Sequence, residues 1–185
     1  MKSIIDTVAS EMTTVLTSVN EEEALHFSQK LNAAKRIFVT GEGRSGLMGK
    51  AFAMRLMHGG YHVYVLGETI TPSIEEGDLL VAISGSGSTG AIYQFASKAK
   101  EAGAQVLLVT TNKQSKIADV SDGTLVIPAA TKYRRPEEPS TIQPLGNQFD
   151  QAVHLVLDAI IIGTLQASKE QTSYEEMTKK HANLE

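Results

Sequence analysis

The sequence predicts an α/β protein: an open parallel sheet of five strands with helices on both faces. Short runs of Val, Ile and Leu alternate with stretches of helical periodicity. These runs are continuously apolar rather than alternating, which is typical of parallel strands buried on both faces. Two segments rich in Gly and Ser each follow a predicted strand and precede a predicted helix. Ligand-binding loops take this position in open parallel sheets.

The first part of the chain, about residues 1–33, predicts two helices. Apolar side chains recur at helical spacing between Ile4 and Leu31. Asn20 is followed by three glutamates, the pattern of an N-cap with an acidic first turn. The two helices are therefore expected to meet near Asn20.

The central part supplies the strands and the helices between them. The predicted strands are residues 36–40, 62–66, 79–83, 105–110 and 124–127. The predicted helices are residues 47–58, closed by Gly59 and Gly60, residues 91–103, and a short one near 115–120.

The pattern changes after the fifth strand. Four of the five prolines, Pro128, Pro136, Pro139 and Pro144, fall in a polar stretch that predicts a long loop, and loops of this length are usually functional. Residues 145–166 predict a helix that is apolar almost all round, which indicates burial against a second subunit as well as the sheet. Residues 173–185 predict a polar, helical tail.

Composition excludes several classes of function. The net charge of −4 argues against a nucleic-acid partner. With no cysteine, the chain has no disulfide, no thiolate nucleophile and no cysteine metal site. The most apolar run, residues 152–165, is too short to span a bilayer and contains His154 and Asp158. Without a recognisable signal peptide, the protein is expected to be soluble and cytoplasmic, with no membrane partner.

Residues 84–90, Ser-Gly-Ser-Gly-Ser-Thr-Gly, are the most informative segment. Glycines let the backbone amides turn inward, and hydroxyls lie beside the positive end of a helix dipole, an arrangement that binds a phosphate. The segment has no lysine, so it is not a nucleotide triphosphate loop. The alternative is a plain turn that caps a helix, but a cap needs one hydroxyl rather than four.

The second Gly-rich segment, residues 41–46, matches GxGxxG, and Glu68 stands where a ribose-binding carboxylate would be. A dinucleotide site is therefore an alternative, but it leaves the 84–90 segment unexplained, and the chain is too short for an added catalytic domain. In the strand order 2-1-3-4-5, the first and third strands are neighbours at the point where ligands bind. Both segments would then face one phosphosugar.

Residues 41–46 together with 84–89 resemble the SIS (sugar isomerase) domain, which binds phosphosugars on a three-layer, flavodoxin-like fold. Residues 51–58, residues 143–146 with Phe149, and the terminal residues 181–185 narrow the resemblance to the 6-phospho-3-hexuloisomerases. The similarity runs end to end. It implies a single domain, 1–185, whose N-terminal helices and tail (about 170–185) pack on neighbouring subunits.

The resemblance implies conversion of D-arabino-3-hexulose 6-phosphate to fructose 6-phosphate through an enediol or enediolate, in the ribulose monophosphate route of formaldehyde fixation or detoxification. It also implies a homo-oligomer, commonly a tetramer, with no metal and no organic cofactor. The substrate-binding residues that it implies are Gly43, Arg44, Ser45, Ser84, Gly85, Ser86, Gly87, Ser88 and Thr89.

Two residues are candidates for the chemistry. The family's usual base is a glutamate after Phe149, and this chain has Asp150 there, one methylene shorter. Asp150 is expected to have a raised pKa from partial burial, or else to act only as a dipole partner in the first helical turn. His181 is the second candidate, as an acid that a tail brings to a neighbouring subunit's site.

Other readings remain open. One is an arabinose 5-phosphate or phosphoheptose isomerase, which would share the phosphate-binding segment. Another is a non-catalytic phosphosugar sensor, which would normally carry a basic helix-turn-helix that the acidic N-terminal helices do not resemble.

Overall fold

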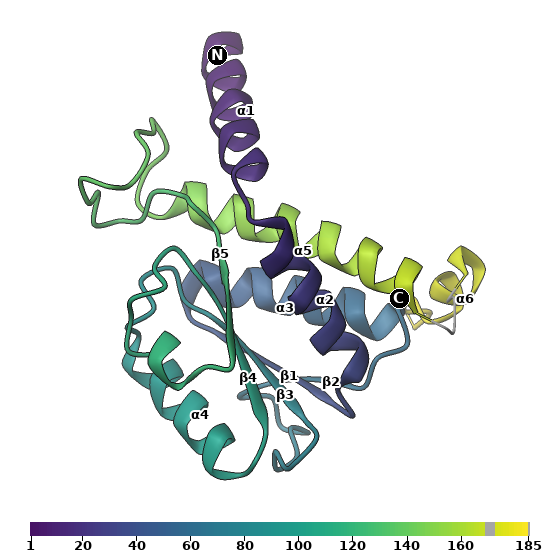
Figure 1. Cartoon of the computed structure of the whole chain (residues 1–185). Helices are drawn as coiled ribbons and strands as arrows, with labels where there is room; N and C mark the ends of the chain where they lie inside the picture. Colours follow the sequence, from purple (N-terminus) through teal and green to yellow (C-terminus); the bar gives the residue numbers. More distant parts are fainter. Residues whose placement is uncertain (169–172, 185) are drawn as a thin grey trace.

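Five parallel strands form one sheet in the order β2-β1-β3-β4-β5 (Figure 1). The computed structural model describes residues 1–168 and 173–184. The strands are β1 (Ile37–Gly41), β2 (Val63–Val65), β3 (Leu79–Ile83), β4 (Gln105–Thr110) and β5 (Gly123–Val126). The predicted fold class and strand order are confirmed, and β1 and β3 pair along their full lengths, from Ile37–Leu79 to Gly41–Ile83.

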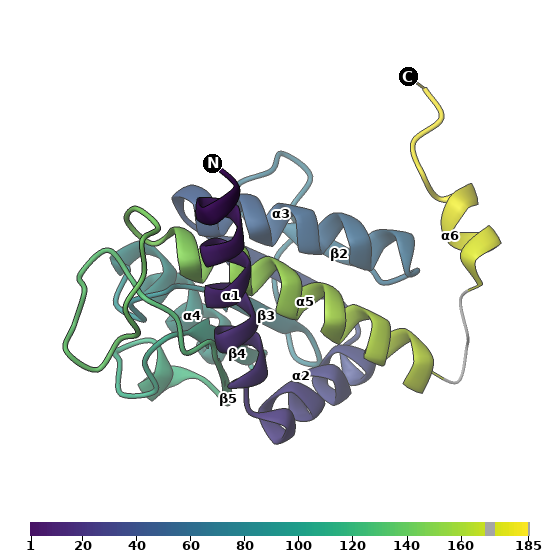
Figure 2. The same cartoon turned by 90° about the horizontal axis from the view of Figure 1, so that it is seen from above.

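Helices cover both faces of the sheet and complete three layers (Figures 1 and 2). One face carries α2 (Glu21–Ala33), α3 (Gly43–His58) and α5 (Asn147–Ala167), with α1 (Lys2–Thr17) packed on α5. The other carries α4 (Gly90–Glu101) and the 3₁₀ turn η1 (Ala118–Val120). A last helix, α6 (Tyr174–Lys179), lies beyond the carboxyl end of α5. No helix in the described ranges is long and apolar enough to cross a membrane.

The strands bury side chains on both faces, as their continuous apolar runs predict. Val39 and Val81 point into the core under α2, α3 and α5, whereas Phe38, Leu80 and Ala82 point into the core under α4. Since successive side chains of a strand alternate between faces, one run of five apolar residues serves two cores.

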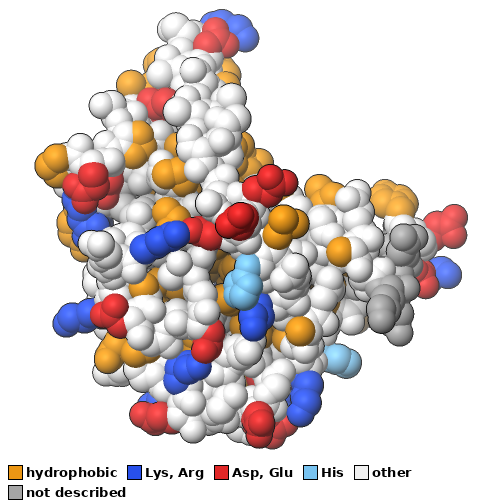
Figure 3. Space-filling view, viewed as in Figure 1, with side chains coloured by type: hydrophobic (Ala, Val, Ile, Leu, Met, Phe, Trp, Pro, Cys, Tyr) orange, Lys and Arg blue, Asp and Glu red, His pale blue; other side chains and the backbone are white. Residues whose placement is uncertain are grey.

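The N-terminal helices meet where the sequence predicts. The Asn20 side-chain oxygen accepts a hydrogen bond of 3.0 Å from the Glu23 amide, so Asn20 caps α2. Before it, α1 projects from the body of the molecule (Figures 1 and 3). Ile4 and Ile5 near its free end are half-exposed.

Three predicted boundaries are wrong. Helix α3 begins at Gly43 rather than residue 47, because Gly46 packs so closely on β1 that a Cβ there would lie 2.5 Å from the Gly41 carbonyl oxygen. Helix α5 begins at Asn147 rather than residue 145, because Leu145 has a φ of +53° that interrupts the helix. In the tail, helix α6 covers only Tyr174–Lys179.

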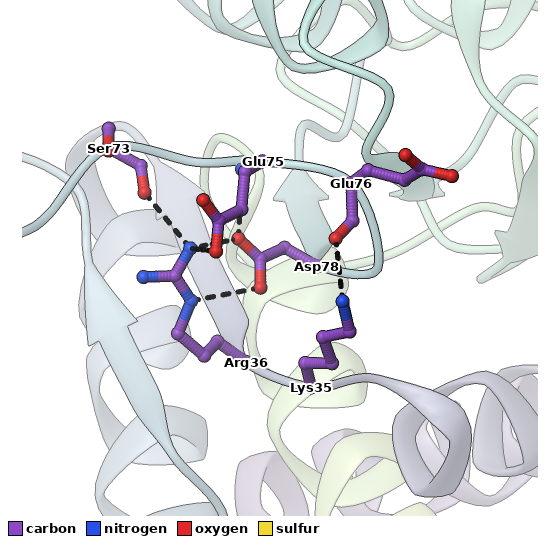
Figure 4. Close-up of polar contacts among 6 residues, drawn as sticks. All are labelled: Lys35, Arg36, Ser73, Glu75, Glu76 and Asp78. Carbon is purple, nitrogen blue, oxygen red and sulfur yellow. Dashed lines mark hydrogen bonds and ion pairs between the residues drawn. The ribbon is translucent and has the colours of Figure 1, made fainter.

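A polar cluster fixes the end of the sheet where β1 and β3 begin (Figure 4). The Asp78 carboxylate, buried completely, accepts hydrogen bonds from Arg36 Nε at 3.0 Å and Arg36 Nη2 at 2.5 Å. Arg36 also lies 3.2 Å from the exposed carboxylate of Glu75 and donates to the Ser73 carbonyl. Because this cluster lies at the amino ends of the strands, it leaves their carboxyl ends to the candidate site.

Replacing Arg36 by methionine is expected to lower the free energy of unfolding by about 3 kcal/mol, because Asp78 would be left as a buried, unpaired carboxylate. Glu75→Gln is the matched control and should change it by under about 1 kcal/mol, since its carboxylate is exposed. Urea denaturation measures both. Equal effects of the two variants would contradict the assignment of Arg36–Asp78 as the stabilising pair.

Candidate active site

A pocket of about 570 Å³ opens at the carboxyl ends of β1 and β3. Its walls come from the β1–α3 and β3–α4 connections, the loop of residues 128–146 (the proline loop) and the start of α5. Of the sequence-predicted site residues, those that line it are Arg44, Ser45, Gly85, Ser86, Ser88, Thr89 and Asp150. Two segments more than forty residues apart in the chain therefore face one cavity, as the strand order predicts.

Three helix N-termini meet at this pocket. Ser45 lies in the first turn of α3, Thr89 is the N-cap of α4, and Asn147 and Asp150 lie in the first turn of α5. The positive ends of three helix dipoles and their free amides make the pocket attractive for anions.

The 84–90 segment forms a hydroxyl-lined cup, although its hydroxyls have different roles. Ser86 and Ser88 line the pocket, and the Ser88 hydroxyl lies 3.1 Å from that of Ser86. Ser84 is buried beneath them, with its hydroxyl 3.0 Å from the Thr89 hydroxyl. Ser84 therefore supports the cup from below rather than lining its surface.

Glycines set the shape of the cup. Gly87 has a φ of +63°, and a Cβ there would lie 2.1 Å from the Ser115 hydroxyl oxygen. At Gly85 a Cβ would lie 3.1 Å from the ring of Phe149. Gly43 also has a positive φ, +57°, at the start of α3, and its side-chain position is open. The cup thus packs directly against the residue that precedes Asp150.

Asp150 is buried, with 6% of its surface exposed, yet it lines the pocket. The Ser45 hydroxyl donates a hydrogen bond of 2.8 Å to its Oδ1. The Arg44 Nε lies 3.3 Å from its Oδ2. The two residues from the first Gly-rich segment thus hold the two carboxylate oxygens.

Burial raises the pKa of Asp150 above its usual value, and this outweighs the hydrogen bond from Ser45 and the charge of Arg44, which lower it. A carboxylate whose pKa is raised is a stronger base once ionised. The predicted direction is confirmed, and the neighbours of Asp150 go beyond a role as dipole partner alone.

The Arg44 guanidinium has a second partner: its Nη2 donates a 2.5 Å hydrogen bond to the Asn147 side-chain oxygen. Its side chain is nevertheless 61% exposed and lines the pocket. Arg44 can therefore hold Asp150 and still reach a bound anion.

The sequence did not identify the pocket residues of the proline loop. Thr131, Lys132 and Tyr133 form one wall, and the Lys132 ammonium lies 5.2 Å from the centre of the Tyr133 ring. Lys132 forms no ion pair with any residue in the described ranges. The length of the loop indicated function, but nothing in its pattern distinguished these three residues.

His181 lies away from the pocket of its own chain. Its ring stacks on His58, 5.4 Å between centroids, at the last residue of α3. Ser45, in the first turn, lies thirteen residues (58 − 45) earlier, about 20 Å at 1.5 Å per residue. The chain alone does not bring His181 and Asp150 together.

The geometry favours proton transfer on a small phosphorylated molecule. The cup offers hydroxyls and amides to an anion, and a carboxylate of raised pKa faces the same cavity. In the described part of the chain, no group of three or more His, Asp or Glu residues is placed to hold a metal ion.

Comparison with known proteins points to one family. The model of the SIS domain matches residues 30–143. The chain is 37% identical to the 3-hexulose-6-phosphate isomerase of Bacillus subtilis, over 96% of this chain and 95% of that protein. It is 38% identical to that of Mycobacterium gastri, over 96% and 88% of the two chains.

A solved structure is similar over nearly its whole length. The crystal structure of a hypothetical protein of Methanococcus jannaschii, from which a function of 3-hexulose-6-phosphate isomerase was inferred, has a TM-score of 0.84 and 31% identity. The match covers 98% of each chain.

The contact between the cup and Phe149 can be tested by adding one methyl group. Gly85→Ala is expected to lower the free energy of unfolding by about 1–3 kcal/mol, because the added Cβ would press on the Phe149 ring. Gly90→Ala is the matched control: its Cβ meets nothing within 4 Å, and it should be neutral or stabilise by up to about 1 kcal/mol. Equal stability of both variants in urea denaturation would rule out the tight contact.

Proposed function

The chain belongs to the SIS domain family, and we propose that the protein is a 3-hexulose-6-phosphate isomerase, which converts D-arabino-3-hexulose 6-phosphate to fructose 6-phosphate. Named relatives that match along most of their length support this activity. The observation that carries the proposal is the buried Asp150 carboxylate, which faces the same pocket as the hydroxyl-lined cup.

The cup binds the phosphate end of the sugar. A phosphate on Ser86, Ser88 and Thr89 accepts hydrogen bonds from their hydroxyls and lies at the N-terminus of α4. This contact does not touch the reacting carbons. Its binding energy places C2 and C3 against the other wall of the pocket.

Asp150 then moves the proton. Its carboxylate removes the proton from C2, which gives an enediolate across C2 and C3 with the charge on the former C3 carbonyl oxygen. The C2 hydroxyl proton passes to that oxygen, and the proton held by Asp150 returns to C3. The result is a C2 carbonyl and a C3 hydroxyl, with no net gain or loss of atoms.

Arg44 and Asn147 stabilise the enediolate. Arg44 lies beside Asp150 and lines the pocket, so its guanidinium is placed where the negative charge moves from the carboxylate to the sugar oxygens. The N-termini of α3 and α5 add to this field.

The assay that tests the function follows fructose 6-phosphate formation from enzymatically made 3-hexulose 6-phosphate. Arabinose 5-phosphate and sedoheptulose 7-phosphate serve as competing substrates. Preferred turnover of either one would replace the proposal with another isomerase of the family. Binding of phosphosugars without turnover would favour the sensor.

Asp150→Asn is expected to lower kcat by at least about a hundredfold, because the proton acceptor is lost. The variant should fold with undiminished stability, since burial disfavours the ionised carboxyl. With the folded-state pKa raised, ionisation of Asp150 reduces wild-type stability as pH rises through that pKa, so the stability difference should grow in favour of the variant. Asp158→Asn, at a half-exposed position of the same helix, is the control and should keep full kcat. A kcat near wild type for Asp150→Asn would remove it from the mechanism.

We also propose that the protein is a homo-oligomer, a tetramer in our prediction, in the cytoplasm. Helix α5 packs on α1, α2 and α3 within the chain, which accounts for much of its apolar surface. Yet an apolar groove of about 500 Å³ remains between α2 and α5, bordered by Leu25, Leu155 and Gly163. A second copy of the chain would bury this groove.

The tail is proposed to reach the pocket of a neighbouring subunit and to supply His181 as an acid. Removing residues 179–185 is expected to reduce kcat at least about tenfold, as loss of a general acid does. Thermal stability should change little, because His181 is exposed and the tail buries no core residue among those described. Unchanged kcat in the truncated protein would exclude this role.

A further inference from the structure

A chain of hydrogen bonds runs from the candidate base to α1. Arg44, which pairs with Asp150, donates to the Asn147 side-chain oxygen, and the Asn147 amide donates at 2.8 Å to the Gln143 side-chain oxygen. The Gln143 amide in turn donates at 2.9 Å to Glu11 Oε2 on α1. Each link uses both ends of a side-chain amide, so the orientation of each group sets that of the next.

The Glu11 carboxylate is an anchor for the proline loop. Its Oε2 accepts a 2.5 Å hydrogen bond from the Thr141 hydroxyl, and its Oε1 accepts one of 2.8 Å from the Ile142 amide. Together with the bond from Gln143, one carboxylate binds three consecutive residues. These residues directly precede Pro144, Leu145 and Gly146, which line the pocket.

The contacts suit an ionised carboxylate and no other group. Burial raises the pKa of Glu11, but the hydrogen bonds from Thr141, Gln143 and Ile142 and the charge of Arg134 lower it by more, so that it lies below its usual value. All three partners donate, and both carboxylate oxygens accept. An amide would turn a donor toward at least one of these donors.

We propose that Glu11 is a positioning residue for the isomerisation: through Gln143 and Asn147 it fixes the Arg44 guanidinium against Asp150. Glu11 touches neither the pocket nor Asp150. The proposal rests on the proposed function only in that Asp150 carries out the proton transfer.

Several titratable groups surround the Asp150 carboxylate. Glu42 and Arg44 come from the β1–α3 connection, and Lys132 and Tyr133 from the proline loop. Among the described residues, Arg44 is the one ionic partner within 4.0 Å of the carboxylate. If Glu11 no longer holds the chain, Arg44 is less tightly fixed and its lowering effect on the pKa of Asp150 weakens.

The test compares Glu11→Gln with Asp6→Asn, which makes the same change of carboxylate to amide at an exposed position of the same helix. Glu11→Gln is expected to reduce kcat about tenfold, because the base and its cation are no longer held in the reactive geometry. The acid limb of the kcat/KM profile should shift to higher pH. Asp6→Asn should change neither. Glu11→Asp, which keeps the charge, should recover part of the loss.

A second variant breaks the next link. Gln143→Met keeps the size of the buried side chain and removes its hydrogen bonds, so it should give the same loss and the same pH shift. The double variant Glu11→Gln, Gln143→Met should lose little more than either single variant, since both cut one chain. Multiplicative losses would contradict a shared route.

The titration of the Asp150 carboxyl, followed by carbon-13 NMR in the free protein, needs no turnover. An Asp150 pKa that is higher in Glu11→Gln than in wild type supports the proposal. An unchanged pKa overturns it, even if kcat falls. Absence of turnover in the wild type would instead reject the proposed function, and the NMR titration would still decide the role of Glu11.

Discussion

The hydrogen bond from Ser45 to Asp150 is the contact on which the site depends. It joins the first turn of α3 to the first turn of α5, between residues 105 positions apart in the sequence. It can form because α3 and α5 pack side by side on one face of the sheet. The close packing of Gly46 on Gly41 brings the start of α3 down onto the end of β1. The sheet thereby sets the depth at which Asp150 is buried.

Opposing effects determine the properties of this carboxylate. Burial disfavours its ionised form, whereas the Ser45 hydroxyl and Arg44 favour it. The balance leaves its pKa raised, but with an ionic partner in place for the charged state. The cup lies across the same pocket and contacts Phe149, the residue before Asp150, through Gly85. Phosphate binding and proton transfer are thus assigned to separate groups held by one packed wall.

Much of the fold and part of the site could be predicted from the sequence. The strands were predictable because double burial makes them continuous apolar runs, and the cup because Gly and Ser cluster where a strand becomes a helix. The start of α3 was not, because helix propensity is low in a Gly-rich segment and the contact with β1 decides it. Lys132 and Tyr133 lie in a loop without periodicity. Glu11 resembled any exposed acid on a helix until the proline loop was placed beside it. The position of the tail relative to other subunits depends on contacts outside one chain.

The most direct test is a crystal structure of the protein with fructose 6-phosphate bound. The account predicts a phosphate within about 3.2 Å of the Ser86, Ser88 and Thr89 hydroxyls. It also predicts that C2 and C3 lie about 3–3.5 Å from an Asp150 oxygen, with Arg44 still against the carboxylate. A phosphate bound outside the cup, or a sugar whose C2 and C3 point away from Asp150, would contradict it.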